Sequence, residues 1–160
     1  AGERAMQKIN PSHSAIIRTS WVYSSNGNNF VKTMLRLGKE REQLEVISDQ
    51  LGTPTYARDL AKAILTILPQ LSNTEVEILN YSNEGVCSWY DFAKAIFEFS
   101  SISVQVRPIA TSQYPTVAKR PFYSVLNKEK IKDKYAVEIP HWNAALKDCL
   151  HILGKEEDIL

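Results

Sequence analysis

SAIIRTSWVY, residues 14–23, is the stretch that decides the fold class of this 160-residue chain. Its first half is a run of small and β-branched apolar residues, which is typical of a strand buried in a parallel sheet. The turn signal NGN follows at residues 26–28. Beyond it, apolar spacing predicts a helix that starts near Asn29 and carries a stripe of Phe30, Met34, Leu35 and Leu37.

The rest of the chain continues this alternation of strand and helix. Short apolar or alternating runs predict strands at residues 44–48, 76–79 and 104–109, and DQLGTPT (49–55) is expected to be a loop. Strands that alternate with helices indicate an α/β fold. These strands are too few for a complete doubly wound sheet, so we expect a portion of a larger fold.

Four further helices are predicted. One spans residues 57–68, with one face formed by Leu60, Ala61, Ile64, Leu65 and Leu68. A second runs over residues 88–99 behind a Ser-x-x-Asp capping box. Asn127 is expected to cap a short basic helix, and Pro140 opens the last one through Leu153. Residues 1–9 also have helical composition but no N-cap, so we expect the tail of a helix that starts upstream.

The composition argues against several classes of partner. The chain has 19 basic and 18 acidic residues, a formal net charge of +1, which predicts neither nucleic-acid nor membrane binding. The lysines at 128, 130, 132 and 134 alternate with acidic residues and are expected to form a solvated helix face. Cys87, Cys149 and the three histidines show no metal-ligand spacing, so reduced, buried thiols and a cytoplasmic protein are expected.

The motifs of catalysis and phosphate binding are missing from the sequence. No G-x-G-x-x-G loop and no G-x-S-x-G elbow occurs. Polar and aromatic residues instead gather in expected loops, where α/β folds bind ligands: Trp21, Asn28–Asn29, Asp49–Gln50 and Lys119–Arg120. Each has a structural alternative, because Trp21 could be a core aromatic and Asn29 a helix cap. Arg120 suits phosphate better than the lysines do, because its fork can bind two oxygens.

Four blocks of the chain resemble the C-terminal half of dTDP-4-dehydrorhamnose reductases, members of the extended short-chain dehydrogenase/reductase superfamily. These blocks are AIIRTSWVYSSNGNNFVKTMLRL, DQLGTPTYARDLA, SWYDFAKAIF and TSQYPTVAKRPFYSVLNKEKI. The resemblance implies that residues 1–160 are the C-terminal substrate-binding part of a Rossmann-like enzyme, without its N-terminal dinucleotide-binding half. Ala1-Gly2-Glu3 would follow closely on the family's catalytic Tyr-x-x-x-Lys pair, which would lie upstream of residue 1.

The resemblance also implies site residues. Thr19 and Ser20 would meet the nicotinamide cofactor, NADPH or NADH, and Trp21 would pack on the sugar ring. Asn29, Phe30 and Gln50 would contact the dTDP-sugar, with Arg120 clamping its diphosphate. Tyr90 and Lys94 match Tyr-x-x-x-K by count, but we expect them on a helix surface. Mg²⁺ and homodimers occur among such reductases, and no ligand cluster here fixes either.

Two kinds of function stay open at this point, and a third, an independent sugar-nucleotide-binding module, ranks below them because the missing sheet would leave its strand edges bare. The intact parent is expected to reduce dTDP-4-dehydro-L-rhamnose with NAD(P)H, while this segment binds sugar nucleotide and is itself inactive. The alternative is a non-catalytic relative, like the regulatory subunit of methionine adenosyltransferase, that acts as a binding partner.

Overall fold

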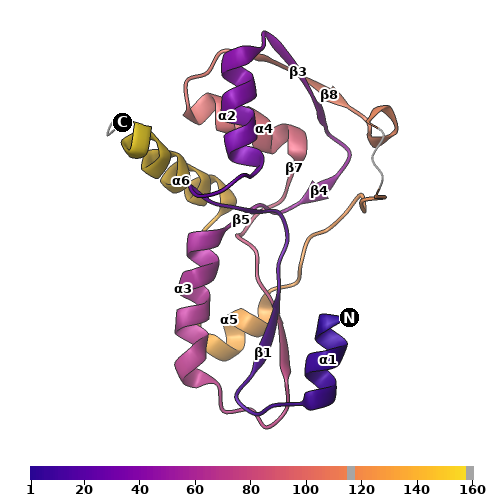
Figure 1. The fold of residues 1–160 in the computed structure, drawn as a ribbon, viewed down its shortest axis with the longest axis vertical. Coiled ribbons are helices and arrows are strands. Elements are labelled where there is room, and N and C mark those ends of the chain that lie inside the picture. Colours follow the sequence, from indigo (N-terminus) through magenta and orange to yellow (C-terminus); the bar gives the residue numbers. More distant parts are fainter. Residues whose placement is uncertain (115–117, 158–160) are drawn as a thin grey trace.

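The computed structural model describes residues 1–114 and 118–157 as an elongated α/β molecule with a lower and an upper half (Figure 1). Its helices are α1 Gly2–Ile9, α2 Phe30–Glu40, α3 Ala57–Ile67, α4 Trp89–Phe99, α5 Glu129–Tyr135 and α6 Trp142–Glu157, with 3₁₀ turns η1 Leu68–Gln70 and η2 Thr111–Gln113. Its strands are β1 Ala15–Arg18, β2 Val22–Tyr23, β3 Gln43–Ile47, β4 Leu51–Gly52, β5 Thr55–Tyr56, β6 Glu77–Asn80, β7 Cys87–Ser88 and β8 Gln105–Ile109.

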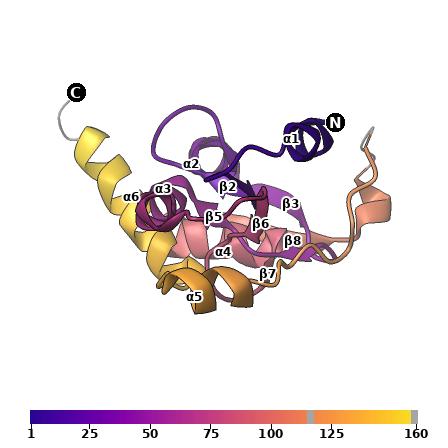
Figure 2. The same cartoon turned by 90° about the horizontal axis from the view of Figure 1, so that it is seen from below.

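The lower half is built on the parallel pair β1–β6, in which Ala15 lies opposite Glu77 and Arg18 opposite Asn80. The predicted strand at residues 14–23 is therefore parallel, but it is broken after Arg18 and only half-buried. The break lies at Trp21, whose φ of 50° is a left-handed conformation that a regular strand does not contain. Figure 2 shows α1 and α5 on opposite sides of this half.

Helix α3 was expected to bury a different face. Its buried residues are Asp59, Ala63 and Ile67, whereas Leu65 is 69% exposed and Leu68 is 55% exposed. Ala63 and Ile67 pack with Leu79, Tyr81, Ile131, Tyr135 and Val137 in the core of the lower half. Asp59 can be buried because Asn83 Nδ2 donates to its Oδ2 at 2.9 Å, and this bond turns the polar residue inward.

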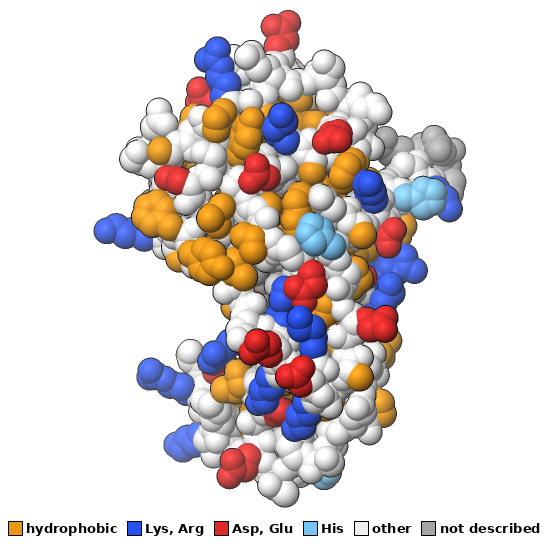
Figure 3. Space-filling view, turned by 180° about the vertical axis from the view of Figure 1, so that it is seen from behind, with side chains coloured by type: hydrophobic (Ala, Val, Ile, Leu, Met, Phe, Trp, Pro, Cys, Tyr) orange, Lys and Arg blue, Asp and Glu red, His pale blue; other side chains and the backbone are white. Residues whose placement is uncertain are grey.

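The basic helix has the solvated face that the sequence predicts at Lys130, Lys132 and Lys134, which are exposed, but not at Lys128. Lys128 is buried and pairs with Glu84, and Lys130 and Lys134 both pair with Glu77 on β6. These ion pairs attach α5 to the β1–β6 sheet. Lys128 is also the N-cap of α5, so Asn127 is not the cap itself, although its side chain accepts a hydrogen bond from the Glu129 amide at 2.8 Å. From behind, acidic and basic side chains lie interspersed over the lower half, and the molecule is hollowed on one side between its two halves (Figure 3).

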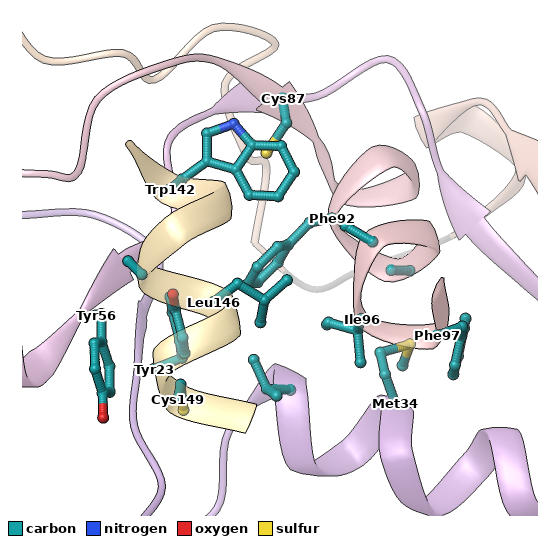
Figure 4. Close-up of a cluster of buried hydrophobic side chains, with 14 of the residues drawn as sticks. Tyr23, Met34, Tyr56, Cys87, Phe92, Ile96, Phe97, Trp142, Leu146 and Cys149 are labelled. Carbon is teal, nitrogen blue, oxygen red and sulfur yellow. The ribbon is translucent and has the colours of Figure 1, made fainter. Parts of the chain in front are cut away.

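The upper half holds the larger core, between α2, α4, α6 and the parallel pair β3–β8. Figure 4 shows Phe92 of α4 reaching toward Trp142 and Leu146 of α6, with Met34 of α2 below. The predicted capping box is present: the Ser88 hydroxyl accepts from the Asp91 amide and the Asp91 carboxylate from the Ser88 amide, each at 3.0 Å. Helix α2 and strands β3, β6 and β8 also lie where the sequence placed them.

Residues 49–55 are more ordered than the loop expected there. Leu51 and Gly52 form β4, which pairs antiparallel with β7, and Thr55–Tyr56 form β5, which pairs with β2. Leu51 also bridges to Tyr123. This short segment therefore joins parts of the chain that are far apart in sequence.

Candidate functional site

A groove of about 620 Å³ lies between α2 and β3 in the upper half. Residues of α2 form one wall and residues of β3 the other, and Ile109 at the end of β8 contributes as well. Side chains from three separate loops or helix ends also reach it: Gln50, Trp89, Gln113, Tyr114 and Arg120. The groove therefore brings aromatic, apolar and polar groups together, as small-molecule sites do.

Three of the residues that the resemblance assigned to substrate line this groove. Phe30 is the first residue of α2, and its ring lies 4.7 Å from the ring of Trp89, centroid to centroid. Gln50 is 3% exposed, and its amide donates to Thr111 Oγ1 at 3.1 Å. Arg120 is exposed and supplies a positive charge. Residues distant in sequence thus converge on one groove.

Trp21 lies beside the groove and stacks on Trp89, which lines it. The two indole rings stack with centroids 3.6 Å apart and planes 10° apart. A side chain at Gly52 would lie 2.7 Å from the Trp21 ring, so the backbone of β4 closes in on the indole. Trp21 is therefore held in place by Trp89 and by the absence of a side chain at Gly52.

Asn29 serves as the N-cap of α2. Its Oδ1 accepts from the Lys32 amide at 3.2 Å, and its Nδ2 donates to the Ser24 carbonyl at 2.7 Å. These bonds use both polar atoms of the side chain to fix the turn before the helix. Asn29 is not among the residues that line the groove.

Thr19 and Ser20 follow β1 at its carboxyl end, the end of a parallel strand where α/β folds bind dinucleotides. The Thr19 hydroxyl donates to Thr55 Oγ1 at 3.4 Å, and the Ser20 hydroxyl donates to the Thr53 carbonyl at 3.3 Å. Both bonds are long, so these hydroxyls remain suited to a further polar partner. Thr19 and Ser20 therefore lie at the carboxyl end of β1 with weakly bonded hydroxyls.

Sequence reasoning missed three notable groove residues. Trp89 was hidden inside the capping-box helix, where it was expected to be an ordinary helical residue. Arg41 directly follows α2 and brings a second guanidinium to the groove, whereas Glu45 of β3 brings a carboxylate. An arginine directly after a helix gave no signal of its own.

Asp49 supplies the strongest polar anchor near the groove. Its carboxylate accepts from the Thr111 hydroxyl at 2.6 Å and from the Thr111 amide at 2.9 Å. These hydrogen bonds, from the side chain first and then the backbone, hold the pKa of Asp49 below its ordinary value. The carboxylate is thereby kept ionised and engaged with the chain after β8.

Residues 1–114 and 118–157 carry few other features that point to a function. No group of three or more His, Cys, Asp or Glu residues there could hold a metal ion. Tyr90 and Lys94 lie one turn apart on α4, with the Lys94 ammonium 6.0 Å from the Tyr90 ring. No helix in this part of the chain is long and apolar enough to cross a membrane.

Two curated proteins are similar in sequence to most of this chain. Spore coat polysaccharide biosynthesis protein SpsK of Bacillus subtilis (strain 168) is 41% identical over 143 residues, which cover 89% of this chain and 49% of that protein. dTDP-4-dehydrorhamnose reductase of Escherichia coli (strain K12) is 41% identical over 161 residues, covering 96% of this chain and 54% of that enzyme. The chain spans about half the length of the curated relatives it matches.

A solved structure and a family model point to the same family as these relatives. The crystal structure of dTDP-4-dehydrorhamnose reductase from Bacillus anthracis str. Ames in complex with NADP superposes with a TM-score of 0.86 at 38% identity. The match covers 95% of this chain and 52% of that one, and it confirms the expected fold class. Residues 1–154 match the model of the RmlD substrate binding domain. The chain therefore belongs to the RmlD substrate binding domain family.

Proposed function

We propose that this chain is the sugar-nucleotide-binding part of a dTDP-4-dehydrorhamnose reductase. Its parent protein would reduce dTDP-4-dehydro-L-rhamnose to dTDP-L-rhamnose with NADPH or NADH. The groove of Phe30, Gln50 and Arg120 is the observation that carries the proposal, because three of the five residues that the resemblance assigns to substrate meet there.

The groove suits each part of a nucleotide diphosphate. Phe30 and Trp89, which already stack on Phe92 and Trp21, line the groove with aromatic surface that a base could contact. Arg120 and Arg41 offer guanidinium forks for phosphate oxygens, and such charge-assisted hydrogen bonds are about twice as strong as neutral ones. The carboxylate of Glu45 repels a diphosphate, so the attraction from the two arginines must exceed this repulsion.

The roles of this chain in the reaction are binding and orientation. Ketone reduction adds a hydride to the carbonyl carbon and a proton to its oxygen, and a nicotinamide cofactor supplies the hydride. Thr19 and Ser20 would hold that cofactor at the end of β1, and Trp21, at the other side of the Trp89 ring, would set the plane of the sugar. We propose that the proton donor is the tyrosine hydroxyl of the Tyr-x-x-x-Lys pair of the parent protein, upstream of residue 1, and that the lysine assists it.

Turnover by the full-length protein tests this proposal. With dTDP-4-dehydro-L-rhamnose present, it should oxidise NADPH or NADH, followed by the loss of absorbance of the reduced nicotinamide. Arg120→Ala should raise KM for the sugar nucleotide about tenfold while kcat changes little, because the lost contact is equal in ground and transition states. An unchanged KM would contradict the diphosphate role of Arg120.

The second candidate function is a non-catalytic binding subunit. A correctly folded full-length protein that binds dTDP but never oxidises NAD(P)H would favour it. The sequence upstream of residue 1 separates the two sooner, since the reductase needs a Gly-rich loop and Tyr-x-x-x-Lys there. The two buried cysteine thiols fit the reducing cytoplasm in which we place the protein.

A further inference from the structure

The segment Asp49–Leu51 holds both flanks of the stretch that carries Arg120. On one flank, Asp49 accepts three hydrogen-bond contacts from Thr111, two from its amide and one from its hydroxyl. On the other flank, the Leu51 amide donates to the Phe122 carbonyl at 2.7 Å, and the Ser124 amide donates to the Leu51 carbonyl at 2.9 Å. One short segment therefore fixes where the stretch leaves the fold and where it returns.

Arg120 depends on this attachment for its position. Within the described residues no carboxylate pairs with its guanidinium, and its side chain is exposed. It lies two residues before Phe122, whose carbonyl accepts the Leu51 amide. Its place at the groove is thus set through the backbone rather than through a side-chain partner.

The polar bonds of Asp49 also differ from the backbone bonds of Leu51 in what they require. Leu51 uses only main-chain atoms, so any residue there can make those bonds. Both the amide and the hydroxyl of Thr111 donate to Asp49 Oδ1, and the amide also reaches Oδ2. A carboxamide at this position would lose the negative charge and would place an NH2 donor against the Thr111 amide. The side chain of residue 49 therefore strengthens a flank that Gln50 and Ser48 also hold, through bonds to Thr111 and to the Ile109 carbonyl.

We propose that Asp49 is a positioning residue that keeps Arg120 at the groove for the diphosphate. The inference rests on the proposed function, because it needs a diphosphate for Arg120 to bind. Asp49 is itself negative and would repel that ligand if it acted by charge alone. Its contribution must therefore come through the hydrogen bonds to Thr111.

Charge repulsion and positioning predict opposite effects of Asp49 on ligand affinity, and a matched pair of variants separates them. Asp49→Asn and Glu45→Gln each remove one negative charge near the same groove. A pure charge effect would tighten dTDP binding in both variants. Positioning predicts that Asp49→Asn weakens binding about tenfold, whereas Glu45→Gln tightens it.

The test measures dTDP binding to the full-length protein by calorimetry. Thr111→Val should weaken dTDP binding as Asp49→Asn does. Thr111→Ser should bind dTDP as the wild type does, because serine keeps the hydroxyl. In an Arg120→Ala background, Asp49→Asn should add no further loss, since the residue acts through Arg120.

Trypsin gives a second readout that does not depend on ligand. It cuts after Lys119 and spares the Arg120–Pro121 bond, and Asp49→Asn should speed this one cleavage while other sites keep their rates. Equal tightening by Asp49→Asn and Glu45→Gln, or full additivity with Arg120→Ala, would overturn the inference while wild-type binding persists. Absence of dTDP binding to the folded wild type would instead overturn the proposed function itself.

Discussion

The indole rings of Trp21 and Trp89 stack face to face, 3.6 Å apart between centroids and 10° from parallel. One comes from the turn after β1 and the other from the first residue of α4, 68 positions further along the chain. Trp89 also contacts Phe30 and lines the groove. The stack therefore connects Trp21, the expected sugar-binding residue, to the groove through the ring of Trp89.

Gly52→Ala should disturb this stack. An added Cβ would lie 2.7 and 2.8 Å from atoms of the Trp21 ring and 2.6 Å from Ser124 Oγ, and such distances force the indole to move. In the full-length protein we expect KM for the sugar nucleotide to rise several-fold, to about tenfold at most. Near-ultraviolet circular dichroism should lose the signal of the coupled indoles.

Gly154→Ala is the matched control for this prediction. A Cβ there meets nothing within 4 Å, so KM and the dichroism spectrum should stay as in the wild type. Wild-type values for Gly52→Ala in both measurements would contradict the part assigned to the Trp21–Trp89 stack.

Asn29 should matter for stability more than for ligand binding. Its side chain caps α2, so Asn29→Ala should lower the free energy of unfolding by about 1 kcal/mol, measured by urea denaturation. Asn29→Ser keeps a capping oxygen and should keep nearly all the stability. If Asn29→Ser left stability intact but weakened dTDP binding tenfold, the side chain would instead be a direct ligand contact.

Local rules predicted the elements well because each rule is satisfied within a few residues. The Ser88–Asp91 capping box depends only on helix geometry and is present. The stripe of α2 also packs on the core, with Met34 buried and Phe30, Leu35 and Leu37 partly buried, but Val31 and Gly38, which the stripe left out, are the other buried residues. The buried face of α3 was missed for a tertiary reason. Asp59 turns inward because Asn83, distant in sequence, donates to it, and no periodicity within residues 57–68 carries that information.

The groove shows the same division between local and distant causes. Phe30, Gln50 and Arg120 were expected together only through the family resemblance, since nothing in their own spacing brings them to one place. Trp89 and Arg41 were missed because each looks like an ordinary helical or surface residue in sequence. The burial of Lys128 was missed because its acceptors, Glu84 and the Asn83 carbonyl, lie on another part of the chain.

The two cysteines should be unreactive in the native protein. Burial, with a smaller effect from the nearby Asp91 carboxylate, raises the pKa of Cys87 to about 12, so almost no thiolate forms at pH 8. Cys149 is 0% exposed. Ellman's reagent should therefore release no colour within minutes from the folded protein, and two equivalents after denaturation in guanidinium. Rapid release of one equivalent without denaturant would contradict the burial of that thiol.

Glu77 should make the stability of the protein depend on pH in the acid range. Burial alone would raise its pKa, but hydrogen bonds from Lys134, Tyr135 and Lys130 outweigh that effect and lower the pKa from 4.5 to about 2. A depressed folded-state pKa stabilises the fold above the unfolded value, and this stabilisation is lost as pH falls from about 4.5 toward about 2. Glu77→Gln should therefore lower the free energy of unfolding by ~2 kcal/mol at pH 7, allowing for the partial exposure of both lysines. The difference from wild type should shrink below pH ~4, which urea denaturation across pH 3–7 measures.

Glu138→Gln changes an exposed carboxylate and should follow the wild-type profile throughout. A Glu77→Gln deficit that stayed constant down to pH 3 would show that the Glu77 contacts act through packing instead of charge.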